Sequence, residues 1–240
     1  MPLSKNLIAP GSYCKEREVA CDAFRCTFDI KNDTIICSDT PVNAVLIGDS
    51  ITEFFDHNIY YNDYGVILNR GIGGDEAQFI DFRFEADVVQ LKPKACIILC
   101  GVNNTWVLED QKDEDGFFKE EPTKEVIKTV VDAFESMFAK AKAAGIEMWV
   151  CSGMPMGDGM PSIEARNKVI QLLNVEYKKL VEKHGGKFID MWTPFVNDEG
   201  KMIPETSRDG VHPNGVGYKV MADVLSPYLE EAFGKREMKK

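Results

Sequence analysis

Ser50 occupies a position that favours acyl-transfer chemistry. It follows the apolar run 44–47, which is bounded by Pro41 and Gly48 and predicts a buried strand. Ser50 therefore lies where a strand gives way to a turn. If the next segment is helical, the Ser50 amide lies at a helix N-terminus, where unpaired N–H groups favour negative charge. A serine hydroxyl beside a free amide is half of an acyl-transfer site, and the base with its orienting acid must come from elsewhere.

One of the three histidines is placed to act as that base. His57 lies just past the Ser50 turn, where we expect it at the surface, and His184 ends a predicted helix, a normal position for a cation. His212 follows Asp209 by three residues in a polar turn, so one turn can present both side chains to the same side. An aspartate there orients the imidazole and stabilises the imidazolium. Taken alone, such a pair is more often a coincidence or a helix cap.

Two further turns contain groups that can stabilise an oxyanion. The glycines of 71–74 let the backbone approach a ligand closely and can aim an N–H group at it. Asn103 carries an amide NH₂, a neutral donor suited to developing negative charge. Each has a structural alternative, because a glycine-rich turn can simply be tight and Asn103 with Asn104 can cap a turn.

Predicted strands and helices alternate along most of the chain. The strands are expected over 44–47, 66–68, 95–100, 146–151 and 187–189, and the helices over 75–90, 123–144, 163–184 and 215–233. We expect the last helix to be kinked or broken near Pro227. The alternation implies βαβ units and a parallel sheet. Ligands bind at the carboxyl ends of such strands, so the turns after the first three strands should share one edge of the sheet.

The first forty residues fit this alternation poorly. Segment 24–30 alternates and 34–37 is β-rich, which together predict a β-hairpin. We interpret 1–40 as a small β-rich extension packed on a main domain of residues 41–240, as an edge strand more readily than as a lid. The acidic run 105–122 is either a functional loop or a solvated insertion.

Length and charge restrict the class of protein. At 240 residues the chain can bury one substantial core, and its net charge of -11 argues against nucleic-acid binding, which needs a basic stripe. No segment has the apolar length of a membrane span, and the N-terminus lacks the apolar region of a signal peptide. We therefore expect a cytoplasmic protein that acts on a small molecule; its oligomeric state is not visible in the sequence.

The seven cysteines are an odd number, so they cannot all pair within one chain. Reduced thiols are the simplest interpretation, with the strand cysteines acting as small apolar residues. Four cysteines cluster near the start without a C-x-x-C pair, which leaves zinc binding or pairing as a minor alternative. These are Cys14, Cys21, Cys26 and Cys37.

Taken together, these motifs resemble those of the SGNH hydrolases, also called the GDSL-type esterase/lipase family. Four of the family's blocks recur in its order between about residues 44 and 232. They are a nucleophile block, an oxyanion glycine, an oxyanion asparagine, and a block with the acid and base. They correspond to Gly48-Asp49-Ser50, Gly74, Asn103, and Asp209 with His212. Any one of these matches is weak, but four in order are strong.

The resemblance implies a flavodoxin-like three-layer α/β/α sandwich with a five-stranded parallel sheet of order 2-1-3-4-5. It also implies metal-independent ester hydrolysis without a cofactor, with acetylated sugars, lipids and acyl thioesters among the family's substrates. The implied nucleophile is Ser50, and the implied oxyanion donors are the Ser50 and Gly74 amides and the Asn103 side chain. Asn104 replaces the aspartate usual at its position, a variation similar to the platelet-activating-factor acetylhydrolase branch.

We therefore expect a serine carboxylesterase or acetylesterase that removes short acyl groups. The short strands and the lack of a long apolar lid favour small acyl groups, and acetyl on a carbohydrate is one candidate. The loop 152–162 carries Met154, Met156 and Met160, which could line an apolar acyl pocket or fill gaps in the core.

Several alternatives stay open. A lipase, a lysophospholipase or an acyl-thioesterase could use the same triad, and the fold could also serve a non-catalytic binding domain. An α/β-hydrolase is disfavoured because no G-x-S-x-G surrounds Ser50. A metal-dependent phosphoesterase usually draws on several histidines, and the sequence places one at this edge. Its ligands would be Asp49, Asp75, Asn103, Asp209 and His212.

Overall fold

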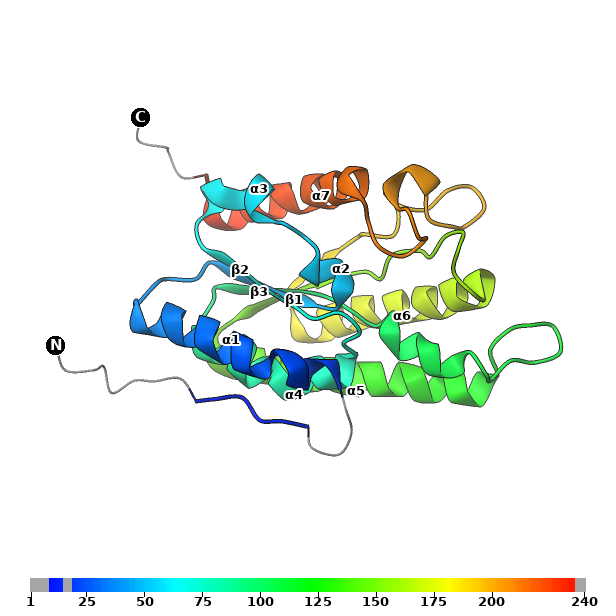
Figure 1. The fold of residues 1–240 in the computed structure, drawn as a ribbon, viewed down its shortest axis with the longest axis horizontal. Helices are drawn as coiled ribbons and strands as arrows, with labels where there is room; N and C mark the ends of the chain where they lie inside the picture. The colour runs from blue at the N-terminus through cyan, green and yellow to red at the C-terminus, as the bar shows by residue number, and fades with distance from the viewer. Residues whose placement is uncertain (1–8, 15–18, 236–240) are drawn as a thin grey trace.

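A five-stranded parallel sheet forms the centre of the computed structural model, which describes residues 9–14 and 19–235 (Figure 1). The strand order is β2-β1-β3-β4-β5, as the family resemblance implied. The strands are β1 (Ala44–Gly48), β2 (Ile67–Gly71), β3 (Ala95–Leu99), β4 (Glu147–Cys151) and β5 (Lys187–Ile189). β2 begins within the predicted segment 66–68 but continues to the glycine-rich turn.

The two central strands position the functional turns. β1 and β3 are buried along their whole length, because every residue in them is apolar or glycine. Gly48 pairs in register with Gly71 on one side and with Leu99 on the other. The turns that follow the first three strands therefore start at the same level of the sheet, as predicted from the sequence.

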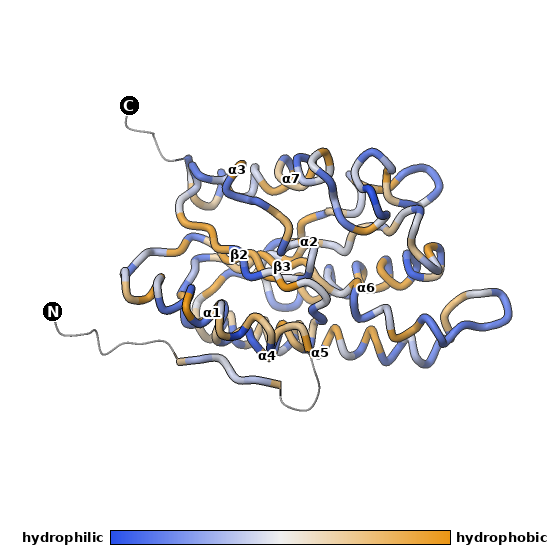
Figure 2. The backbone as a smooth tube through the Cα atoms, viewed as in Figure 1, coloured by the Kyte–Doolittle hydropathy of each residue, from blue (hydrophilic) through white to orange (hydrophobic). Residues whose placement is uncertain are grey.

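Helices cover both faces of the sheet and complete three layers (Figure 1). One face carries α1 (Ala20–Cys37), α4 (Ala77–Asp87), α5 (Glu120–Ala144) and α6 (Ile163–His184). The other carries α2 (Ser50–Glu53), α3 (Asn58–Tyr61) and α7 (Gly215–Phe233). Short 3₁₀ turns complete the connections: η1 (Asn62–Tyr64), η2 (Val89–Leu91), η3 (Asn103–Leu108) and η4 (Pro204–Thr206). Figure 2 shows apolar positions gathered at the sheet and hydrophilic ones along the outer loops.

The β-hairpin predicted over 24–37, and with it the β-rich character of the N-terminal extension, is wrong. This segment lies within helix α1, which packs against α4. Its aromatic and β-branched residues favour a strand locally, but burial of one helical face against α4 outweighs that preference. The buried positions recur at helical spacing: Cys21, Arg25, Phe28 and Asn32.

The last helix was expected to be kinked or broken near Pro227, and the second alternative is wrong, because α7 continues through this residue. Proline removes one helical N–H donor, and neighbouring groups support the turn before it. Ser226 donates its hydroxyl to the Ala222 carbonyl at 2.7 Å, and the Tyr61 hydroxyl donates to the same oxygen at 3.1 Å. Among the described residues, no helix is both long and apolar enough to cross a membrane.

The acidic run 105–122 is partly structured. The 3₁₀ turn η3 includes its start, and helix α5 begins at Glu120. Between these elements, Lys112 and Phe118 pair across an isolated antiparallel bridge, and the Asp113 carboxylate accepts the backbone N–H groups of Asp115 and Phe117. The run is therefore a hairpin-like projection that joins η3 to α5.

Candidate active site

The turn after β1 presents Ser50 as the first residue of α2. Asp49 caps this short helix, because its carboxylate accepts the Ile51 N–H at 3.0 Å. The first N–H groups of a helix have no intrahelical partner. The Ser50 hydroxyl and amide therefore both lie at a helix N-terminus, as the sequence indicated.

A hydrogen-bonded series joins Ser50 to two residues near the other end of the chain. Ser50 Oγ lies 2.8 Å from His212 Nε2, and His212 Nδ1 lies 2.7 Å from Asp209 Oδ2. In the tautomer with the proton on Nδ1, His212 donates to Asp209 and accepts from Ser50. This is the geometry in which histidine can take a serine proton while a carboxylate stabilises the imidazolium.

The Asp209 carboxylate is fixed by its own turn. Its Oδ1 accepts the backbone N–H groups of Val211 at 3.0 Å and His212 at 2.8 Å. Burial opposes ionisation of Asp209, but the hydrogen bonds from the His212 ring and these two amides outweigh it and hold its pKa well below the usual range. Asp209 therefore stays ionised and keeps the His212 ring oriented.

The glycine loop, residues 71–75, lies against the Ser50 turn. Gly73 donates its N–H to Glu53 Oε2 at 2.5 Å, and a Cβ placed on Gly73 would lie 3.6 Å from Ser50 Cβ. Gly74 has a φ of +79°, a left-handed conformation that glycine adopts without steric cost, and it is exposed. The loop can therefore turn an N–H group towards a ligand at Ser50.

Asn103 begins η3 and reaches the same loop. Its Nδ2 donates to the Asp75 carbonyl at 2.9 Å, and its Oδ1 accepts from Trp106 Nε1 at 3.3 Å. These two contacts set the orientation of the amide, so that the NH₂ group faces the glycine loop. An amide nitrogen carries two hydrogens, so Asn103 can donate the second one to a ligand.

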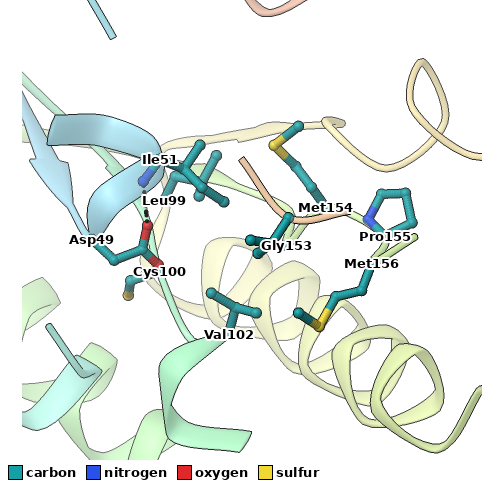
Figure 3. Close-up of a pocket in the computed structure, with 10 residues that line it drawn as sticks. Asp49, Ile51, Leu99, Cys100, Val102, Gly153, Met154, Pro155 and Met156 are labelled. Atoms are coloured by element: carbon teal, nitrogen blue, oxygen red, sulfur yellow. Dashed lines mark hydrogen bonds between the residues drawn. The ribbon is translucent and has the colours of Figure 1, made fainter. Parts of the chain in front are cut away.

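A small cavity of about 10 Å³ lies among the chain neighbours of these residues (Figure 3). It is lined by residues next to Ser50, Asn103 and His212 and by the loop after β4. The lining residues are Asp49, Ile51, Leu99, Cys100, Val102, Gly153, Met154, Pro155, Met156 and Val211. We call this space the acyl cavity, after the role that we propose for it. Met154 and Met156, which the sequence suggested for such a pocket, line it; Met160 is not among the lining residues.

The acyl cavity includes a buried carboxyl group. Asp49 Oδ2 is buried and has no hydrogen-bond partner in the described part of the chain. Burial raises the pKa of Asp49 to about 7. The group is therefore largely neutral below this pH, when it adds little polarity to the apolar walls.

A family model for GDSL-like lipases and acylhydrolases matches residues 46–220. The chain belongs to this family. It is therefore a hydrolase that acts on ester bonds, and the match contains every residue of the site described above. The comparison with curated proteins finds no match.

Solved structures share the fold of this GDSL-like acylhydrolase. A proposed acylhydrolase from Bacteroides fragilis is 24% identical with a TM-score of 0.66, covering 85% of this chain and 94% of that one. A protein from Streptococcus pneumonia, described as a proposed platelet activating factor, is 20% identical with a TM-score of 0.69, covering 88% and 94%. A catalytic mutant of an acetylxylan esterase from Geobacillus stearothermophilus is 18% identical with a TM-score of 0.62, covering 79% and 94%.

The other two histidines of the acylhydrolase are bonded elsewhere. His57 is buried, with its Nε2 2.7 Å from the Ile67 carbonyl, so the surface position expected for it is wrong. At the end of α6, His184 Nε2 lies 2.6 Å from Glu135 Oε2, and the His184 ring stacks on Phe138. His212 is thus the histidine that contacts Ser50.

Two of the side chains that a metal-dependent phosphoesterase would use as ligands make other contacts. Asp49 caps α2, and Asp75 pairs with Arg83 at 2.7 Å. Within residues 9–14 and 19–235, no group of three or more His, Cys, Asp or Glu side chains is arranged to hold a metal ion.

The seven cysteines are free, and burial raises the pKa of Cys21 and of Cys151 to about 12.

Two residues near the site were missed by the sequence reasoning. Phe54, which is 56% exposed, packs beside the His212 ring at a centroid distance of 5.3 Å. Arg83 is buried and bonds to Asp75 and to the Gly48 carbonyl. Asp75 lies two residues before α4 and Arg83 lies within this helix, and this closeness in the chain was the available signal for the pair.

Proposed function

We propose that this acylhydrolase is a serine carboxylesterase that removes short acyl groups, above all acetyl. Ser50 attacks the acyl carbonyl, and His212 takes its proton and later delivers it to the leaving alcohol. Asp209 orients His212 throughout. The Ser50 and Gly74 amides and the Asn103 side chain donate to the oxyanion. The observation that carries the proposal is the unbroken contact series from Ser50 through His212 to Asp209.

The size of the acyl cavity supports a preference for acetyl. A volume of about 10 Å³ corresponds to one water-sized group, which is close to a methyl group. Ile51, Val102 and Val211, which adjoin Ser50, Asn103 and His212 in the chain, line the cavity, and we propose that the acyl group enters beside them. A longer chain would have to displace these side chains, and packed interiors resist such displacement.

We propose a carbohydrate as the leaving group. Two structural neighbours are described as acetylxylan esterases, which supports this choice. Phe54 beside His212 and Trp106 beside Asn103 are both partly exposed, at 56% and 38%. The Phe54 ring, and the face of Trp106 opposite the Arg166 guanidinium that lies 4.0 Å over it, offer apolar surface on which a sugar ring can pack while its hydroxyl groups stay in water.

The test is hydrolysis of p-nitrophenyl esters with acyl chains of two to twelve carbons, with and without EDTA. We expect kcat/KM to be highest for the acetate, to fall with chain length and to be unaffected by EDTA. Ser50→Ala should lower kcat by about 10⁵ or more, because it removes the covalent route. Near-full turnover by Ser50→Ala would refute the mechanism, and a preference for long chains would favour a lipase or acyl-thioesterase.

A second assay addresses the leaving group. Acetate release from acetylated xylan is measured beside release from p-nitrophenyl acetate, with the Ser50→Ala protein as the blank. Serine-dependent release from the polysaccharide supports the carbohydrate proposal. Activity on p-nitrophenyl acetate without release from xylan would contradict it for this polymer and leave the esterase mechanism in place.

A further inference from the structure

A buried arginine links the two loops that form the proposed active site. Arg83 of α4 donates from Nε to Asp75 Oδ2 at 2.7 Å and from Nη2 to the Gly48 carbonyl at 3.2 Å. Gly48 lies two residues before Ser50, and Asp75 directly follows Gly74. One guanidinium group therefore bonds the backbone beside the proposed nucleophile and the side chain of the residue beside the proposed oxyanion glycine.

Helix α1, which lies outside the region matched by the family model, holds this arginine in place. Arg25 donates from Nη2 and Nη1 to the two oxygens of Asp87, at 2.6 and 3.1 Å. Asp87 Oδ2 also accepts from Arg83 Nη1 at 3.2 Å. All three side chains are buried, so water cannot replace a lost partner.

A second polar contact joins α1 to the strand that enters the glycine loop. Asn32 donates from Nδ2 to Asp87 Oδ1 at 3.0 Å and to the Ala86 carbonyl at 2.9 Å. Its Oδ1 accepts from Arg70 Nε at 3.0 Å and Nη2 at 2.8 Å. Arg70 immediately precedes Gly71, so Asn32 links Asp87 to the beginning of the loop.

Apolar contacts bring α1 against the loop itself. Ile72 is fully buried and packs in one cluster with Cys21 and Phe28 of α1. A Cβ placed on Gly74 would lie 3.9 Å from Ala20 Cβ, so α1 begins beside the exposed glycine. The helix therefore contacts the loop directly as well as through the arginines.

We propose that α1 is a positioning element of the oxyanion hole and that Arg25 is its positioning residue. The inference rests on the proposed serine mechanism. Arg25 shares the Asp87 carboxylate with Arg83, so that Arg83 bonds Asp87 through Nη1 alone and keeps Nε for Asp75 and Nη2 for Gly48. Without Arg25, Asp87 draws the Arg83 guanidinium towards itself. The Gly74 N–H then moves out of line with the oxyanion.

The first test is Arg25→Met, which keeps side-chain length and removes the donors. We expect kcat for p-nitrophenyl acetate to fall by about 10- to 100-fold with KM changed less than about twofold, because a misplaced donor weakens transition-state binding alone. Affinity for 1,1,1-trifluoroacetone, whose adduct with Ser50 places an oxyanion in the same hole, should fall by a similar factor.

Two variants serve as comparisons. Arg25→Lys keeps the charge but lacks the planar fork, so its kcat should lie between those of the wild type and Arg25→Met. Val130→Ala removes buried apolar volume from α5 and should lower the Tm without changing kcat or inhibitor affinity. If Arg25→Met lowers the Tm as Val130→Ala does and leaves both kinetic readouts unchanged, α1 has a structural role alone and the proposal is wrong.

Hydrogen exchange of the backbone amides in 71–77 gives a readout independent of activity. If the wild-type protein hydrolyses no ester, the proposed function fails, and exchange still tests whether Arg25 orders the loop. Faster exchange in Arg25→Met, without a change in α5, supports the positioning role, and unchanged exchange overturns it. If Arg25→Met does not fold, Asp29→Ala decides by the same measurements, because it removes the carboxylate that accepts from Arg25 Nε at 2.9 Å near the surface.

Discussion

Asn103 donates from its side-chain amide to the Asp75 carbonyl at 2.9 Å, which ties together two loops 28 residues apart in the chain. The same amide nitrogen can donate its second hydrogen to a substrate. One side chain therefore orders the glycine loop and takes part in the proposed oxyanion hole.

Asn103→Ala should lower kcat for p-nitrophenyl acetate by about 10²–10³ with little change in KM, because the lost donor acts on charge that develops in the transition state. Steady-state kinetics on the purified variant measure both constants. The control is Asn197→Ala, which removes an asparagine whose Oδ1 accepts two backbone N–H groups in a different turn. An unchanged kcat in Asn103→Ala would exclude Asn103 from the oxyanion hole.

Asp209→Asn should lower kcat by about 10⁴, because an asparagine can donate to His212 Nδ1 and so favours the tautomer with its proton facing Ser50. Asp190→Asn is the matched control. Asp190 Oδ1 also accepts two neighbouring backbone N–H groups, from Trp192 and Thr193. Equal losses in the two variants would show that turn structure, and not orientation of the base, explains the effect.

Val102→Ala should widen the acyl cavity beside Asn103. We expect the ratio of kcat/KM for the butyrate to that for the acetate to rise about 10-fold, since each methylene that fits an apolar pocket adds binding energy. Val107→Ala, at a position 69% exposed in η3, should leave the ratio unchanged. A ratio that stays at the wild-type value in Val102→Ala would place the acyl chain elsewhere.

Phe54→Ala should raise KM for acetylated xylan about three- to tenfold and leave kcat for p-nitrophenyl acetate within about twofold, because a single aromatic packing contact is lost. Phe82→Ala, a similarly exposed phenylalanine on α4, is the control. Equal effects of Phe54→Ala on both substrates would mean that the ring supports His212 and does not bind the sugar.

Asp49→Asn should remove a pH dependence from folding stability. Burial raises the pKa of Asp49 from 3.8 to about 7, so the folded state binds this proton more tightly than the unfolded state. The stability linked to this proton is present at low pH and is lost as pH rises from about 4 to about 7. Urea unfolding of both proteins across this range measures it. We expect the difference in unfolding free energy between the two proteins to change by at most about 1.4 kcal/mol per pH unit. If this difference does not depend on pH, the raised pKa of Asp49 is contradicted.

The sequence was sufficient to predict the sheet because β1 and β3 are short apolar runs bounded by turn residues. It was not sufficient for α1. The face that this helix buries includes Arg25 and Asn32, polar residues that a pattern of apolar positions assigns to the surface. Their partners, Asp87 and Arg70, are distant in the chain, so the pairing exists only in the folded protein.

The sequence was sufficient to predict those parts of the candidate site whose residues lie in a single turn or next to a strand. Asp209 and His212 share one turn, and Ser50 and Asn103 lie in the turns that follow β1 and β3, so their positions at one edge of the sheet could be inferred from spacing. The burial of His57 was not predictable, because it depends on Phe55 beside it and on the Ile67 carbonyl across the fold. The acyl cavity likewise depends on loops that sequence alone does not place together.

Ser50 and His212 lie 162 positions apart in the chain. Under the proposed mechanism the nucleophile is synthesised early, and its base arrives with the last turn before α7. A growing chain on the ribosome would therefore carry Ser50 without the proposed proton acceptor until the segment up to His212 has been made. Proteolysis within 209–212 would break the turn whose hydrogen bonds orient the His212 ring, so under the proposed mechanism a cut there should lower hydrolysis.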